Sequence, residues 1–98
     1  MEEQQQVKFK VDESEMIRSY ANAFRTNQTP EELVLDFGFN LTTQEEATKE
    51  TNMTFKIDNR VVLNYYSAKR LAISIGQALR AHEEQFGEIE VESAKRSL

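Results

Sequence analysis

Cysteine is absent from this sequence of 98 residues, and histidine occurs once, as His82. A chain without cysteine forms neither disulfides nor a thiolate nucleophile, which is typical of proteins from a reducing compartment. One histidine with neither a cysteine nor a nearby pair of carboxylates does not supply the ligands of a zinc site. The three glycines are scattered and form no phosphate-binding loop. We therefore expect neither a metal nor a cofactor, and we do not expect an enzyme.

Long apolar runs are also absent. No run approaches the about 18 consecutive apolar residues of a membrane-spanning helix, and the N-terminus lacks a basic region followed by an apolar one. We therefore expect a cytoplasmic bacterial or archaeal protein without membrane contacts. Positive charge is in the minority, and the net charge of −5 disfavours general nucleic-acid binding, because phosphate backbones attract clustered Lys and Arg.

The length of the chain leaves room for one domain. Charged and amide-rich sequence at residues 1–6 and 90–98 predicts two disordered tails around a domain of residues 7–89. A chain of this size buries roughly two thirds of the surface that its unfolded form exposes, so its core is thin.

Alternation of apolar and polar residues predicts two strands in the first third of the chain. Residues 7–11 alternate in this way and are followed by the acidic residues 12–15, which end the strand. The second strand runs from residue 17 or 18 to residue 26. Its alanines and arginines would also suit a helix. We favour a strand, because Phe24 must share a core with the strands that follow.

Residues 27–32 predict a turn, with one helical turn as an alternative in which Thr29 is the N-cap and Pro30 the first helical residue. The clearest strand follows at residues 33–41. Its apolar side chains point one way and form the predicted centre of the core, each contributing roughly 1.5–3 kcal/mol if fully buried. They are Leu33, Leu35, Phe37, Phe39 and Leu41.

A polar segment at residues 42–52 predicts a flexible hairpin loop. The strand 54–63 returns, with one predicted apolar face made of Phe55, Ile57, Val61 and Leu63. Asn59 falls on this face and indicates a bulge or a polar contact. A tight turn at Asp58 and Asn59 that splits the strand is the alternative.

A helix is predicted for residues 64–86, with Asn64 as N-cap and Gly87 as C′ residue. Its apolar stripe has spacings of three and four and consists of Ala68, Leu71, Ala72, Ile75, Leu79, His82 and Phe86. The sequence thus predicts a two-layer α+β domain. An antiparallel meander sheet of three to four strands packs against one C-terminal helix.

Five short segments form an ordered series: residues 20–22 (YAN), 29–38 (TPEELVLDFG), 60–63 (RVVL), 68–71 (AKRL) and 86–89 (FGEI). This series resembles a family of small bacterial and archaeal proteins that is known only as a domain of unknown function, and the similarity spans residues 7–91. Tyr65 stands where such proteins often have a proline at the start of the helix. The resemblance implies a compact, strand-rich domain with a C-terminal helix, and it implies no activity.

The outer face of the predicted sheet is locally basic on an acidic protein. Its residues are Lys8, Lys10, Arg25, Asp36, Lys56, Asp58 and Arg60. Such a face would suit recognition of an acidic peptide or, as a weaker alternative, of nucleic acid; for the face by itself we favour a solvated surface with weak ion pairs. Asp36 is expected to pair with Arg25, Arg60 or Lys56, and a catalytic carboxylate or a cation ligand is the other reading. Gly38 indicates a bulge or a close approach of another backbone.

The helix carries two further candidate features. His82 would act as a general base or pH switch, or else be a half-buried histidine hydrogen-bonded at the edge of the core, which we favour. A second apolar patch consists of Tyr65, Tyr66, Ile73 and Gly76. A loop could cover this patch, but the thin core and the open sheet edges favour self-association as a homodimer.

These features favour a non-enzymatic binding or adaptor module for another protein, acting through the polar sheet face or a strand edge. A nucleic-acid-associated regulator that uses the same basic face is the first alternative. A looser likeness in fold to the export chaperone SecB adds a chaperone-like oligomer as the second.

Overall fold

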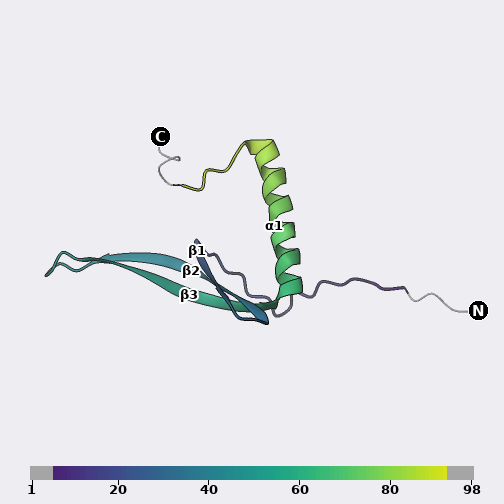
Figure 1. The fold of residues 1–98 in the computed structure, drawn as a ribbon, viewed down its shortest axis with the longest axis horizontal. Coiled ribbons are helices and arrows are strands. Elements are labelled where there is room, and N and C mark those ends of the chain that lie inside the picture. Colours follow the sequence, from purple (N-terminus) through teal and green to yellow (C-terminus); the bar gives the residue numbers. More distant parts are fainter. Residues whose placement is uncertain (1–5, 93–98) are drawn as a thin grey trace, which may run out of the picture.

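The computed structural model describes residues 6–92, which form three strands followed by one helix (Figure 1). The elements are β1 (Ala23–Gln28), β2 (Glu32–Gln44), β3 (Thr51–Asn64) and α1 (Tyr65–Phe86). The strands pair antiparallel in the order β1-β2-β3. The predicted α+β arrangement, a meander sheet followed by a C-terminal helix, is confirmed. The predicted tails fall mostly on residues 1–5 and 93–98, which lie outside the described residues.

The segment before β1 differs from the prediction. Residues 7–11 form no strand, and Val7, Phe9 and Val11 are 82%, 96% and 86% exposed. An alternating pattern provides the two faces of a strand but not its partner, and this segment extends away from the sheet (Figure 1). The second predicted strand is confirmed only in its last part, because β1 begins at Ala23.

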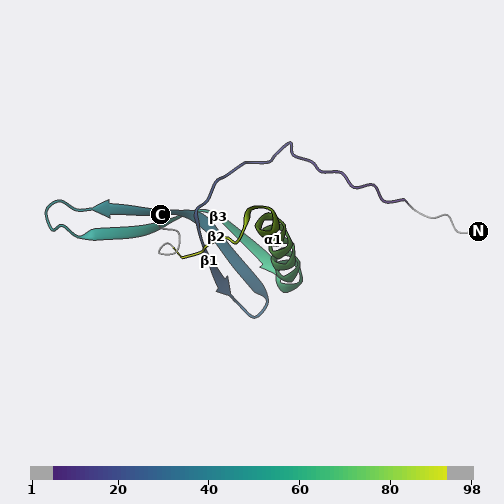
Figure 2. The same cartoon turned by 90° about the horizontal axis from the view of Figure 1, so that it is seen from above.

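Two hairpins join the strands. Between β1 and β2, the Thr29 N–H donates to the Glu32 carbonyl at 2.9 Å and the Thr29 hydroxyl accepts from the Glu32 N–H at 3.0 Å, so a reverse turn forms around Pro30 and no helical turn. Between β2 and β3, the connection is residues 45–50. It is shorter than the predicted loop, because β2 and β3 continue as a two-stranded arm beyond Ala23, the first residue of β1 (Figure 2).

A bulge interrupts the pairing of β2 with β3. Phe37 is opposite Asn59 and Gly38 is opposite Ile57, so Asp58 is the additional residue. This confirms the bulge expected at Asn59 and excludes a turn there. Because directly paired residues share a face, the bulge moves Phe55 and Ile57 to the face of Gly38, away from Val61 and Leu63. The prediction of one continuous apolar face on β3 was therefore wrong.

The sheet has no fully buried apolar side chain within residues 6–92. The apolar side chains of β2 that were predicted to form the centre of the core are half-buried, apart from Leu41, which is exposed. The single chain thus covers its apolar surface incompletely.

Helix α1 begins and ends as predicted. The Asn64 side chain accepts a hydrogen bond from the Ser67 N–H at 2.8 Å, and Gly87, with φ of 94°, donates its N–H to the Glu83 carbonyl at 2.8 Å. The helix rises steeply from the end of β3 (Figures 1 and 2), so the sheet leaves much of its apolar stripe uncovered. No helix in the described part of the chain has the length and apolarity to cross a membrane.

Replacing the N-cap Asn64 with alanine should lower the free energy of unfolding by about 1 kcal/mol, because the Ser67 N–H loses its acceptor. Urea denaturation followed by circular dichroism measures the change. Asn52→Ala, an exposed position on β3, should change stability by less than about 0.5 kcal/mol. Equal losses in the two variants would contradict a specific capping role.

Candidate functional site

Three charged residues from three strands lie side by side on the sheet. Asp36 in the central strand β2 is opposite Arg25 of β1 and Arg60 of β3. Nε of Arg25 donates to Oδ2 of Asp36 at 2.8 Å. Nε of Arg60 donates to Oδ1 at 2.7 Å, and its Nη2 donates to Oδ2 at 3.1 Å. We call these residues the Arg–Asp–Arg row, and the register of the sheet alone is sufficient to assemble it.

The carboxylate at the centre of the row is completely buried, whereas the side chains of Arg25 and Arg60 are 51% and 55% exposed. Hydrogen bonds from Arg60, and then from Arg25, lower the pKa of Asp36 from its ordinary 3.8 to about 2. The same contact raises the pKa of Arg60. Both carboxylate oxygens accept hydrogen bonds, so the predicted ion pairing of Asp36 with Arg25 and Arg60 is confirmed.

The row presents unused donors on its outer side. Within the described residues, Arg25 donates only through Nε, and Arg60 only through Nε and Nη2. Two guanidinium groups against one carboxylate leave one net positive charge. Exposed guanidinium N–H groups of this kind bind carboxylate or phosphate oxygens in pairs. The row therefore has the chemistry of an anion-recognition site.

Gly38 lies two residues after Asp36 and is also buried. A Cβ at this position would collide with the carbonyl oxygen of Lys56 and would lie 2.8 Å from the carbonyl carbon. The predicted close approach of another backbone is confirmed, and it coincides with the bulge at Asp58. Glycine thus permits the bulge next to the row.

The other residues of the predicted basic face do not join the row. Lys56 is opposite Phe39, three residues from Asp36, and therefore lies on the other face of the sheet. Asp58 is the unpaired bulge residue. Lys8 and Lys10 belong to the extended segment before β1, which forms no strand. Simple alternation assigned Lys56 to the wrong face, because the additional residue in β3 reverses the faces of the residues that precede it.

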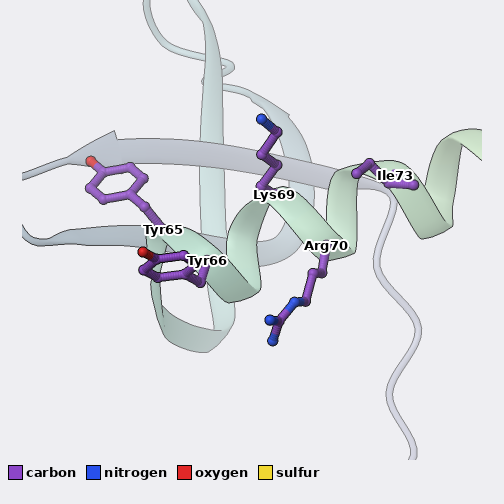
Figure 3. A pocket seen from close by; sticks show the side chains of 5 residues that line it. All are labelled: Tyr65, Tyr66, Lys69, Arg70 and Ile73. Atoms are coloured by element: carbon purple, nitrogen blue, oxygen red, sulfur yellow. The ribbon is translucent and has the colours of Figure 1, made fainter.

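The second candidate surface lies on the first turns of α1. Three of its four predicted residues, Tyr65, Tyr66 and Ile73, line an open hollow of about 320 Å³ together with Lys69 and Arg70 (Figure 3). Gly76 does not line it. The two cations were missed, although each is four residues after a tyrosine and such pairs are neighbours on a helix.

His82 is exposed and its ring lies 4.8 Å from that of Phe86. It makes no hydrogen bond to another described residue, so the interpretation as a half-buried, hydrogen-bonded histidine was wrong. Among residues 6–92 there is no group of three His, Asp or Glu that could hold a metal ion. Within the described residues, His82 therefore has no neighbouring group with which it would form a catalytic or metal-binding site.

The chain was also compared with known proteins. Residues 1–91 match the family model described as "Protein of unknown function (DUF3467)", and the chain therefore belongs to this family. The resemblance found in the sequence is confirmed. No curated protein and no solved structure matches the chain.

Proposed function

We propose that this member of the DUF3467 family is a non-enzymatic binding module that recognises an acidic segment of another protein through Arg25 and Arg60. The observation that supports the proposal is the Arg–Asp–Arg row, in which a buried carboxylate holds two half-exposed guanidinium groups. The row is the combination of a fixed scaffold and free donors that specific recognition of a carboxylate needs.

The central carboxylate serves to position the arginines. A free arginine side chain loses conformational entropy when it binds, by up to about 2 kcal/mol on common scales. Because Asp36 already fixes Nε of both side chains, part of this loss is incurred on folding. A ligand carboxylate would then meet donors that are in place, which is the physical meaning of preorganisation.

An acidic protein segment suits the row better than a nucleic acid. One net positive charge in a chain of net charge −5 is far less than the clustered cations that a phosphate backbone attracts. The two arginines of the row also lie on the outer strands β1 and β3 of the described sheet, so an extended segment has room beside either of them.

Binding of a fluorescein-labelled oligoglutamate peptide, followed by fluorescence anisotropy at low salt, tests the proposal. Arg25→Gln should weaken binding by roughly tenfold, because it removes one charge-assisted contact. Arg60 still makes two hydrogen bonds to Asp36 in this variant, so the fold should be retained.

Lys56→Gln is the matched control, since it removes the same charge from the opposite face of the sheet. The proposal predicts little change in this variant. Equal weakening by both substitutions would indicate a non-specific charge effect and contradict the proposal. Preferential binding of a labelled single-stranded oligonucleotide, lost in Arg25→Gln, would favour a nucleic-acid-associated role instead.

A further inference from the structure

The fold leaves the apolar stripe of α1 without a partner in the described structure. Leu71, Ile75 and Leu79 are 39%, 49% and 47% exposed, and Phe86 at the end of the helix is also exposed. These residues share one face at the spacing of a packed helix. An amphipathic helix of a folded protein normally buries such a stripe, because helix stability comes mainly from its packing.

The whole chain also exposes more surface than a folded monomer of its size. Its accessible surface is 9897 Å², whereas a chain of 11.4 kDa is expected to expose about 5,800 Å². Part of this surface belongs to the segment before β1, which extends away from the sheet, and part belongs to the exposed stripe of α1.

We propose that α1 packs against α1 of a second copy in antiparallel orientation, with the two-fold axis near Ile75. The stripe is complementary to itself about this point. Antiparallel pairing places Leu71 of one copy beside Leu79 of the other, and it places the small Ala68 beside the larger His82. Ile75 meets its own copy at the axis, the leucines face each other and the larger His82 faces the small Ala68, which is an arrangement that fills a helix interface.

Charge supports the same orientation. Lys69 and Glu83 are about four helical turns apart and lie on the same side of the stripe. Antiparallel pairing brings Lys69 of each copy next to Glu83 of the other. In a parallel pair these two residues stay about 21 Å apart along the axis and do not meet. These charges also oppose the dipole of their own helix, which has no acidic residue in its first turn and no basic residue in its last. In an antiparallel pair, Lys69 lies near the C-terminal part of the other helix and Glu83 near its N-terminal part, where the dipole of that helix favours each charge.

The oligomeric state of two isoleucine variants provides the first test. Ile75 and Ile73 are 49% and 54% exposed in the single chain but lie on nearly opposite sides of α1. Size-exclusion chromatography with light scattering should give twice 11.4 kDa for the wild type. Ile75→Asp should raise the dimer Kd by roughly 100-fold, and Ile73→Asp should leave it within about twofold.

A wild type that stays monomeric over the accessible concentrations would overturn the inference. So would a dimer that Ile73→Asp dissociates and Ile75→Asp does not, because the interface would then be the patch of Tyr65, Tyr66 and Ile73. Ile75→Asp is checked for helix content by circular dichroism, since loss of the second copy can also unfold the chain.

Cysteine crosslinking tests the orientation directly. The chain has no cysteine of its own, so only the introduced cysteines can form a disulfide. Ile75→Cys lies at the axis and should form a disulfide-linked dimer. Leu71→Cys should not, since its two copies would be about 12 Å apart along the helix axis, beyond disulfide reach. An equimolar mixture of Leu71→Cys and Leu79→Cys should crosslink. Efficient crosslinking of Leu71→Cys with itself would indicate a parallel pair and overturn the proposed geometry.

Charge reversal gives a third readout. Lys69→Glu alone and Glu83→Lys alone should each raise the dimer Kd by roughly tenfold, because each creates two like-charge contacts. The two changes in one chain should restore the dimer. Within a single helix the two residues are about 21 Å apart, so rescue requires the second copy. Glu83 Oε2 also accepts a hydrogen bond from the Ile89 N–H at 3.0 Å within the chain, so the double variant is compared with Glu83→Lys alone, which loses the same bond. A double variant that dimerises no better than Glu83→Lys alone, while the wild type is dimeric, would overturn this pairing. The inference is independent of the proposed function, because Arg25 and the peptide assay take no part in these experiments.

Discussion

Replacing Gly38 with alanine should lower the free energy of unfolding by roughly 3 kcal/mol or more, at the upper end of the range for overpacking. The added Cβ collides with the carbonyl oxygen of Lys56, which belongs to the backbone of the neighbouring strand and cannot rotate away. The total stability of a chain of this length is on the order of 5–15 kcal/mol, so the variant should be unfolded at much lower urea concentrations. Urea titration followed by circular dichroism measures the shift.

Gly76→Ala is the matched control for this prediction. Apart from the chain neighbours and the adjoining backbone of α1 itself, no atom lies within 4 Å of a Cβ built at Gly76, and alanine is more favourable than glycine in a helix interior by about 1 kcal/mol. The same substitution should therefore stabilise the chain at one glycine and destabilise it at the other. Equal effects would contradict the bulge geometry, and a loss at Gly76 would place another chain close to that position.

The sequence predicts the ends of the helix and the first hairpin turn correctly, because neighbouring residues determine both. Asn64 and Gly87 define α1 because both capping residues act through their immediate neighbours. The β-hairpin turn at Pro30 is likewise local. The strand predicted at residues 7–11 does not form, because a strand depends on a distant partner. A strand must pair with the edge of another strand, and the pattern within the segment does not show whether such an edge is available.

The candidate site depends on pairing between strands, and sequence predicts it only in part. The complementary charges of Asp36, Arg25 and Arg60 suggested their ion pairs correctly. Lys56 was assigned to the same face by simple alternation, which the additional residue at Asp58 inverts. Asn59 and Gly38 carried the signal of a bulge. The change of face then follows from the register, which the sequence does not state.

Replacing Asp36 with asparagine should produce the second large loss of stability. The substitution keeps the size of the side chain but removes the charge that both arginines share. Two guanidinium groups then lie close together around a buried amide that can also donate hydrogen bonds, so one donor is left facing another. We expect a markedly lower urea midpoint at pH 7. Asp58→Asn, at the exposed bulge residue, should change stability by less than about 0.5 kcal/mol.

The effect of Asp36→Asn should depend on pH in a defined direction. Because Arg60 and Arg25 lower the pKa of Asp36 to about 2, from an ordinary value of 3.8, the folded state binds the proton less readily than the unfolded state. The stabilisation is therefore complete above the unfolded value of about 4 and is lost as the pH falls through about 2. Urea titrations of wild type and variant should differ most at pH 7 and converge towards pH 2. A difference that stays constant across this range would show that the arginines do not hold Asp36 through its charge.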